Sequence, residues 1–586
     1  MTQQKESIER RINGLARRDT LLRAVRHAVR PSQVWIRAGI IAAGLTAGIP
    51  GAGAAPFPPV FPLANLIPPG GGDGSEGFVL RGIGESDLSG NSVSGAGDVN
   101  GDGVDDVLIG APVAMPGGLH WAGESYLVFG STQGFAPAFP LATLYPAGGG
   151  DGSRGVVFPG FEEDAFVGDS VSAAGDVNGD GIGDLVIGAS DAQGGAYVVF
   201  GSTQAFPAVL PLAALYPAGG GDGSRGFVLY GRPFDLAGRS VSAAGDVNGD
   251  GIDDLILAGG GHGFGGAYVV FGRNTAQTGN FPAVFPLPDL LLDHGGDGSE
   301  GFALIGLPSD GAGSTVSAAG DVNGDGVDDV IIRAGGLGNA GGSYVVFGTT
   351  EGFPAEFVLA SLLPSGGGDG SRGFVLEGID EGDVTGGAAR GAGDVNGDGL
   401  DDLIIGALSA DPGGKSGAGE AYVVFGSTQP FPPLFPLATL YPAGGGDGSS
   451  GFVLTGTGEN DQAGSSVSAA GDVNADGIDD LVIAALMADR DERSMVGEAY
   501  VVFGSTQPFP AVLPLLTLEP GAGGDGSVGF VLPGINGGDR AGSSVDGAGD
   551  VNGDGIDDLV IGSDGAPQFS PTSGQTYVVF GRSAGP

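Results

Sequence analysis

The chain contains no cysteine among its 586 residues, which excludes disulfide bonds and thiol chemistry. Histidine is almost as rare. His27 lies near the N-terminus, and His120, His262 and His294 lie in three separate glycine-rich segments. No Ser-His-Asp, Cys-His or zinc-ligand spacing is present, so the three later histidines are predicted to be surface residues in loops. The sequence therefore favours a protein that is not an enzyme.

Basic residues are also scarce, with 23 Lys and Arg against 69 Asp and Glu, which gives a net charge of −46. Nine of the 23 lie in residues 1–37, so the rest of the chain is more acidic still. Such a surface repels nucleic acid and anionic lipid, and both are excluded as partners. Bound divalent cations are the partners that would offset this charge.

An uncharged segment rich in Gly and Ala, residues 38–55, follows the basic residues 1–37. It is interrupted by Pro50 and ends in small residues at Ala54 and Ala55. A basic segment, an apolar segment and a small-residue cleavage site together predict a secretory signal peptide, residues 1–55. The alternative is an uncleaved membrane anchor, although the apolar segment is short for a span. Residues 56–586 would then form one exported domain, with no membrane insertion after cleavage.

What the chain has in excess is glycine, with 123 residues and no G-X-Y period, which excludes collagen. No helical periodicity appears after residue 56. Instead, a unit recurs seven times with four short runs of the type GFVL, SVSAAG, DLVIG and YVVFG, each bounded by glycine. Runs of β-branched and aromatic residues of this length predict strands.

Between the second and third runs lies an acidic segment of the form D-x-N-x-D-G-x-x-D. Oxygen-bearing side chains stand at its positions one, three, five and nine, and position six is a glycine that permits a sharp turn. Hard cations such as Ca²⁺ are held by six to eight oxygen ligands, so each copy is predicted to be a calcium loop in a β-hairpin. The seven copies begin at Asp98, Asp176, Asp246, Asp321, Asp394, Asp472 and Asp550.

Seven units of four strands predict an all-β protein, a seven-bladed β-propeller with four antiparallel strands per blade. The points at which the repeat starts and stops also predict how the ring of blades closes. The run GFVLRG at residues 77–82 precedes the first complete unit, and the last unit ends at YVVFG, residues 577–581, without a fourth strand. The N-terminal strand is therefore expected to complete the last blade, which removes both free sheet edges.

These repeats resemble the FG-GAP repeats of the integrin α-subunit head, with "FG" in YVVFG and "GAP" in residues 109–112. The resemblance covers residues 57–586 and implies a seven-bladed propeller with calcium loops between the first two strands of each blade. Seven intact loops are more similar to stand-alone bacterial members of this repeat class. An EF-hand is excluded, because position twelve is Ile109 within an apolar run and no helices flank the loop.

The resemblance also implies the ligands of up to seven Ca²⁺ ions, with side chains at positions one, three, five and nine and a backbone carbonyl at position seven. Two loops depart elsewhere: Gly183 replaces aspartate at position eight, which is not a ligand, and Ala475 replaces glycine at position four, where strain is expected. The implied ligands are Asp98, Asn100, Asp102, Val104, Asp106, Asp176, Asn178, Asp180, Ile182, Asp184, Asp246, Asn248, Asp250, Ile252, Asp254, Asp321, Asn323, Asp325, Val327, Asp329, Asp394, Asn396, Asp398, Leu400, Asp402, Asp472, Asn474, Asp476, Ile478, Asp480, Asp550, Asn552, Asp554, Ile556 and Asp558.

A DGS tripeptide also recurs once per unit, in the connection that leads from a YVVFG run to the next GFVL run. Its aspartate and glycine predict a tight turn, with a second cation role for the aspartate as the alternative. The seven copies begin at Asp73, Asp151, Asp222, Asp297, Asp369, Asp447 and Asp525.

The loops that follow the DLVIG run differ in length from unit to unit. They are longer in units one, five, six and seven, which are contiguous in a closed ring, and they contain Trp121, Lys415, Arg490 and Arg493. Loops on rigid scaffolds commonly carry recognition, so a protein or glycan ligand is expected on this half of the upper face, with neutral loop drift as the alternative. The sequence thus favours a secreted or cell-surface, monomeric adhesion or recognition module. A carbohydrate-binding lectin and a polysaccharide-active enzyme are the alternatives.

Overall fold

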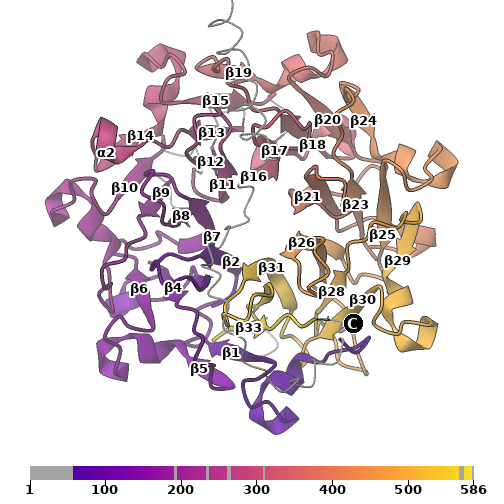
Figure 1. Ribbon diagram of the computed structural model, residues 1–586, viewed down its shortest axis with the longest axis horizontal. Coiled ribbons are helices and arrows are strands. Elements are labelled where there is room, and N and C mark those ends of the chain that lie inside the picture. The colour runs from indigo at the N-terminus through magenta and orange to yellow at the C-terminus, as the bar shows by residue number, and fades with distance from the viewer. Residues whose placement is uncertain are drawn as a thin grey trace, which may run out of the picture. The chain divides into compact units, whose positions relative to one another are not determined.

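The computed structural model describes residues 57–190, 194–232, 237–259, 265–307, 311–565 and 573–583. The predicted signal peptide, residues 1–55, and His262 lie outside these ranges. All described residues belong to one compact unit, Ala54–Pro586. Within it, seven sheets stand around a central axis as the blades of a β-propeller, which confirms the predicted fold (Figure 1).

Each blade contains four antiparallel strands, as predicted. The innermost strands are β2 (Ser92–Gly97), β7 (Val167–Gly175), β11 (Val241–Gly245), β16 (Ala312–Gly320), β21 (Thr385–Gly393), β26 (Ala463–Gly471) and β31 (Ala541–Gly549). The second strands are β3 (Asp106–Ala111), β8 (Asp184–Ala189), β12 (Asp254–Ala258), β17 (Asp329–Ala334), β22 (Asp402–Ala407), β27 (Asp480–Ala485) and β32 (Asp558–Ser563). The third strands are β4 (Glu124–Val128), β9 (Gly195–Val199), β13 (Gly266–Val270), β18 (Gly342–Val346), β23 (Glu420–Val424), β28 (Glu498–Val502) and β33 (Gln575–Val579). The fourth strands, from blade one to blade seven, are β6 (Gly155–Pro159), β10 (Gly226–Tyr230), β15 (Gly301–Ile305), β20 (Gly373–Glu377), β25 (Gly451–Thr455), β30 (Gly529–Pro533) and β1 (Gly77–Arg81).

The outer edge of each blade is covered by the connection that follows it around the ring. In five blades this connection adds a three-residue parallel strand, which the sequence did not predict: β5 (Ala138–Pro140), β14 (Val284–Pro286), β19 (Glu356–Val358), β24 (Leu434–Pro436) and β29 (Val512–Pro514). In blades one and six a single parallel bridge takes its place, Val157 with Val209 and Val60 with Val531. Because an uncovered edge strand invites pairing with another chain, this cover protects the blades against aggregation.

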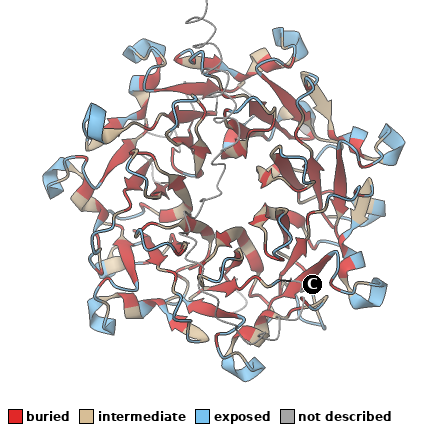
Figure 2. Ribbon diagram, viewed as in Figure 1, coloured by how far each residue is buried: buried red, intermediate tan, exposed pale blue. Residues whose placement is uncertain are grey.

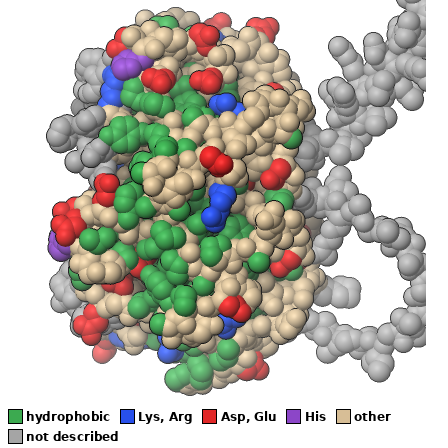
Figure 3. All heavy atoms as spheres, turned by 90° about the vertical axis from the view of Figure 1, so that its left-hand side faces the viewer, with side chains coloured by type: hydrophobic (Ala, Val, Ile, Leu, Met, Phe, Trp, Pro, Cys, Tyr) green, Lys and Arg blue, Asp and Glu red, His purple; other side chains and the backbone are tan. Residues whose placement is uncertain are grey.

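Short helical turns follow the outer strands and form the exposed corners of the ring, which appear pale blue in Figure 2. In each connection a four-residue 3₁₀ turn is followed by a three-residue turn. The four-residue turns are η1 (Leu63–Leu66), η4 (Leu141–Leu144), η6 (Leu212–Leu215), η9 (Leu287–Leu290), η12 (Leu359–Leu362), η15 (Leu437–Leu440) and η17 (Leu515–Leu518), and the one α-helical turn in the described part of the chain is α2 (Thr275–Thr278). The outer wall in Figure 3 shows acidic side chains scattered over it and few basic ones.

The ring closes between the two ends of the repeat, as predicted from its phase. Strand β1 pairs antiparallel with β33, from Gly77 opposite Val579 to Arg81 opposite Gln575. Blade seven therefore has the order β31-β32-β33-β1, with three strands from the C-terminal part of the chain and one from the N-terminal part.

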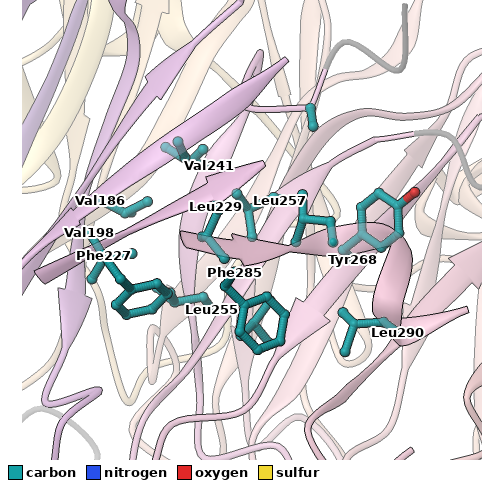
Figure 4. Packing of buried hydrophobic residues seen from close by; sticks show 14 of the residues in the cluster. Val186, Val198, Phe227, Leu229, Val241, Leu255, Leu257, Tyr268, Phe285 and Leu290 are labelled. Carbon is teal, nitrogen blue, oxygen red and sulfur yellow. The ribbon is translucent and has the colours of Figure 1, made fainter. Parts of the chain in front are cut away.

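The hydrophobic core lies between neighbouring blades. The second strands are buried along their length, apart from the half-buried Arg333 in β17, which explains why they read as continuous apolar runs rather than as alternating patterns. In Figure 4, side chains of blade two meet side chains of blade three: Val186, Val198, Phe227 and Leu229 on one side, and Val241, Leu255, Leu257 and Tyr268 on the other. Each blade thus stabilises the next.

Candidate metal centres

Every D-x-N-x-D-G-x-x-D segment forms the hairpin between the innermost and second strands of a blade, as predicted. In blade one, β2 ends at Gly97 and β3 begins at Asp106, so the acidic segment fills the connection. The order of these strands is the same in all seven blades, so the seven loops lie at equivalent positions around the ring.

The aspartate at position one folds the loop around its own carboxylate. In blade one, Asp98 Oδ1 accepts the backbone N–H groups of Gly101 at 2.7 Å and Asp102 at 3.0 Å. Its Oδ2 accepts the N–H of Gly103 at 2.7 Å. At position five, Asp102 Oδ1 accepts the N–H of Val104 at 3.1 Å. These bonds close a tight turn that begins at position one and includes position five.

The aspartate at position nine ties the start of the loop to the turn after the third strand, and its side chain is fully buried. Asp106 Oδ2 accepts the N–H of Val99 at 3.1 Å, and its Oδ1 accepts the N–H of Gly130 at 2.9 Å. Burial raises the pKa of this carboxyl well above its usual range, and the charges of Asp98 and Asp102 raise it further. In blade six the same causes raise the pKa of Asp480 to about 9.

The asparagine at position three lies against the buried carboxylate of position nine. In blade two, Asn178 Nδ2 donates to both carboxylate oxygens of Asp184, at 3.1 and 3.2 Å. In blade six, Asn474 donates to Asp480 in the same way, and its Oδ1 is buried without a hydrogen-bond partner among the described residues. A buried acceptor without a donor costs free energy, which a cation at this point would offset.

Among the residues that the structure describes, no three acidic or histidine side chains stand in a ready-made metal cage. The loop carboxylates instead accept backbone N–H groups. Each carboxylate has about four lone-pair sites, so these bonds leave capacity for a cation. Together with the buried carboxylate at position nine and the orphaned oxygen of Asn474, this donor set fits a hard divalent cation.

Position eight, which the sequence left without a role, joins neighbouring blades. In six of the seven blade interfaces its carboxylate accepts the backbone N–H of position one in the preceding blade. In one of them, Asp253 Oδ2 accepts the N–H of Asp176 at 2.8 Å. The same carboxylate packs on Gly175, where an added Cβ would lie 2.4 Å from it. The other five pairs are Asp246 with Asp328, Asp321 with Asp401, Asp394 with Asp479, Asp472 with Asp557 and Asp550 with Asp105, the last of which closes the ring.

The seventh interface lacks this bond because Gly183 occupies position eight in blade two. The space opposite it is open, since a Cβ added to Gly97 would have no atom within 4 Å. Sequence reasoning missed the role because the bond joins residues about one repeat apart. The signal available was the recurrence of aspartate at this position in six copies, always facing a glycine just before position one.

We expect Asp328→Ala to destabilise the interface between blades three and four. The substitution leaves the N–H of Asp246 without its acceptor, which now lies at 2.9 Å, and a part-buried donor without a partner costs about 1–3 kcal/mol. Gly183→Asp is the matched control, because it would supply the missing bond at the seventh interface. Chemical denaturation should show the first variant less stable than the parent and the second at least as stable. Equal loss in both variants would contradict the role of position eight.

Ala475, at position four of the sixth loop, lies in the left-handed region with φ 60°. The corresponding Gly101 has φ 74°. Because a Cβ disfavours this conformation, the strain expected at Ala475 is present.

The DGS tripeptides form the tight turns that the sequence predicts. Asp73 Oδ1 accepts both the N–H of Ser75 at 3.0 Å and its hydroxyl at 2.6 Å. These bonds hold the pKa of the exposed Asp73 carboxyl below its usual value.

The longer loops lie at the end of the strands opposite the acidic loops. Most of their basic residues bond to other groups of the protein. Lys415 Nζ donates to the carbonyl of Thr457 at 2.7 Å. Arg490 pairs with two carboxylates, Glu498 and Glu519, at 2.5 and 2.8 Å. These bonds tie the longer loops to neighbouring segments of the chain.

Two further residues singled out in these loops behave differently. Arg493 donates to the carbonyl of Ile535 and pairs with Asp491 at 3.2 Å. Trp121 is 43% exposed and lies between His120 and Phe166. Of the four residues predicted for ligand recognition, Trp121 is the one that offers an exposed apolar surface.

The described histidines are surface residues, as predicted. His120 pairs with Asp164 at 2.8 Å, and His294 lies 3.9 Å from Asp289. About half of each imidazole is exposed, 54% and 44%. Within the described ranges, no helix is long and apolar enough to cross a membrane.

Comparison with known proteins identifies the repeats. The family described as "FG-GAP repeat" matches residues 89–128, 312–346, 386–424, 463–502 and 541–579. Each match runs from the innermost to the third strand of a blade.

Integrin alpha pat-2 of Caenorhabditis elegans is 29% identical over 284 residues, which make up 48% of this chain and 20% of that protein. Phosphatidylinositol-glycan-specific phospholipase D of Bos taurus is 30% identical over 182 residues, 31% of this chain and 19% of that protein. The human enzyme of the same name gives the same identity and coverage. The chain thus spans about a fifth of the length of the curated relatives it matches.

Proposed function

We propose that the chain is an exported recognition or adhesion module stabilised by Ca²⁺, because FG-GAP repeats match five of its seven blades and part of the chain is similar to integrin alpha pat-2. The observation that carries this proposal is the buried carboxylate at position nine of every loop. In blade five, Asp402 is fully buried and accepts only N–H groups, from Val395 and Gly426. A buried charge is costly unless a cation or a strong donor compensates it.

Calcium, when bound, supplies the positive charge that these carboxylates lack. The residues of the chain supply the rest: position one folds the turn, position three orients its amide oxygen, and position nine anchors the loop to the turn after the third strand. Binding to the folded protein alone would stabilise the propeller by mass action. Weak sites, with dissociation constants of about 10⁻⁴–10⁻³ M, suit an extracellular module, as the predicted export signal in residues 1–55 would require.

Recognition is proposed for the loops at the end of the strands opposite the calcium loops. Loops carried on a rigid ring present fixed surfaces, and Trp121 is exposed there. We infer that the chain acts by binding and not by catalysis. The match to a phospholipase D covers only 19% of that enzyme and supports the shared repeat.

The test is a binding array of glycans and extracellular proteins, probed with the Ca²⁺-loaded full chain. We expect a defined ligand, binding that is lost in EGTA, and weaker binding of Trp121→Ala. Leu516→Ala is the control, because Leu516 is similarly exposed, at 45%, but lies on an outer turn of the ring. Turnover of acidic polysaccharides, or binding that Trp121→Ala leaves unchanged, would contradict the proposal.

A further inference from the structure

In blade four, the second strand carries an arginine where the repeat has a small residue. The fifth position of this strand is Arg333 in β17, whereas the other six blades have Gly110, Gly188, Ala258, Gly406, Ala484 and Gly562 there. A Cβ added to Gly110 would lie 2.0 Å from the carbonyl oxygen of Gly168 in the next blade, so blade one has no room for a side chain at this point. Blade four accommodates a long basic side chain in its place.

The guanidinium of Arg333 lies at the end of the strands opposite the calcium loops. Its Nη1 donates to the hydroxyl oxygen of the exposed Ser314 in β16, at 3.3 Å. A Cβ added to Gly335, just after β17, would lie 3.4 Å from Nη2. The Nε is buried without a hydrogen-bond partner among the described residues. Because a guanidinium has five N–H donors, this one long bond leaves most of them unused.

A second arginine reaches the same place from blade three. Arg239 directly precedes Ser240, whose hydroxyl oxygen accepts the backbone N–H of Val316 in β16 at 3.2 Å. This bond holds the start of β11 against β16, two residues from Ser314, and the Arg239 residue is exposed there. Burial first, and the charge of Arg239 second, lower the pKa of Arg333. The two guanidinium groups therefore lie within electrostatic reach of each other.

Neither of these two arginines forms an ion pair with an acidic residue in the described part of the chain. Arg540 of blade seven, by comparison, pairs with Asp564 at 3.5 Å. No carboxylate counteracts the two effects that lower the pKa of Arg333. Two neighbouring cations without a counter-charge repel each other, and a bound anion would remove this repulsion. The pair is unusual in a chain with a net charge of −46.

We propose that Arg239, Ser314 and Arg333 bind a tetrahedral oxyanion, a sulfate or phosphate group, between blades three and four. Guanidinium groups donate paired, charge-assisted hydrogen bonds to such oxygens, and the serine hydroxyl adds a further donor. A sulfate or phosphate group offers three or four oxygens to donors that come from three strands. A carboxylate has only two oxygens and one charge, so it matches two arginines less well.

This site goes beyond the recognition proposed for the loop of Trp121. It lies in blades three and four and requires neither that loop nor Ca²⁺. The acidic residues elsewhere on the surface do not prevent anion binding, because salt at physiological concentration screens charges beyond about 8 Å. The two arginines therefore dominate the electrostatic potential at this point.

The experiment is a calorimetric titration of the Ca²⁺-loaded full chain with D-glucose 6-sulfate, D-glucose 6-phosphate, inorganic sulfate and D-glucose. We expect saturable binding of the anions and at least about tenfold weaker binding of D-glucose, because hydrogen bonds to a charged group are the stronger ones. The anion that binds most tightly identifies the source of the group, a free ion or an ester.

The repeat supplies variants that other blades already tolerate. Arg333→Gly reproduces Gly110 of blade one and should abolish anion binding. Arg239→Ser reproduces Ser465, the equivalent residue of blade six, and should weaken binding about tenfold. The control is Arg225→Ser, which removes an exposed arginine from the connection before β10 and should leave the titration unchanged.

Three results would each overturn the proposal: D-glucose binding as tightly as the anions, no binding of any of the three anions, or equal effects of Arg225→Ser and Arg333→Gly. The calcium proposal is tested separately on the same sample. If that sample melts at a higher temperature in Ca²⁺ than in EGTA but binds none of the anions, this inference fails while the calcium-stabilised propeller stands.

Discussion

A chain that begins after Gly82 is expected to lose cooperative folding. It lacks strand β1, whose residues Phe78, Val79 and Leu80 are fully buried. Burying three such side chains contributes about 5–9 kcal/mol, which is comparable to the net stability of a folded protein. The truncation also removes the connection that covers blade six, where Val60 bridges to Val531, and the stacking of Phe78 on Phe135, whose ring centroids lie 4.0 Å apart.

The matched control begins at Phe57 and keeps every described contact of β1. We expect this control to give one sharp thermal transition by circular dichroism. The shorter chain should give a broad transition or aggregate, because the edge of β33 is then unpaired. If the two chains melted within a few degrees of each other, closure of the ring by β1 would not be important for stability.

The strand order and the closure of the ring by β1 could be predicted from the sequence, because the order of the runs within each unit shows where that unit begins and ends. The loose GFVLRG segment at residues 77–82 and the missing fourth strand of the last unit are complementary, and a ring of blades leaves one way to join them. The hairpin position of the acidic loops followed for the same local reason, since apolar runs flank each loop directly.

Contacts between repeats could not be predicted in this way. The bond from the N–H of Asp176 to Asp253 joins residues 77 positions apart, and only the twist of neighbouring blades brings them together. Arg490 stood out in sequence as a candidate for ligand binding. Its partners, Glu498 and Glu519, come from a strand and an outer turn, and nothing local in the sequence pairs them.

Removal of calcium is expected to lower the melting temperature by about 10–15 °C. At about 10 mM Ca²⁺, seven sites with dissociation constants near 10⁻⁴–10⁻³ M contribute about 1.4–2.7 kcal/mol each, or about 10–19 kcal/mol together. Divided by the unfolding entropy of a domain of this size, that free energy corresponds to the stated shift in melting temperature. Asp402→Asn removes one buried ligand charge and should reduce the shift by about one seventh.

The effect should grow with pH. Without metal, burial first and neighbouring acids second raise the pKa of the position-nine carboxyls, to about 9 for Asp480. A carboxyl with a raised pKa binds its proton more tightly in the folded state, so its contribution is largest below the unfolded pKa near 4. The metal-free protein therefore becomes less stable as pH rises from about 4 to 9. Calcium binds the ionised form, so the Ca²⁺-loaded protein should resist this loss.

The decisive measurement is a thermal melt of the purified chain in Ca²⁺ and in EGTA, with bound calcium counted by equilibrium dialysis on the same sample. Seven ions per chain, a lower melting temperature in EGTA and a wider gap at pH 8 than at pH 5 are the predicted results. Fewer than one ion per chain, together with identical melting curves, would show that these acidic hairpins do not hold metal.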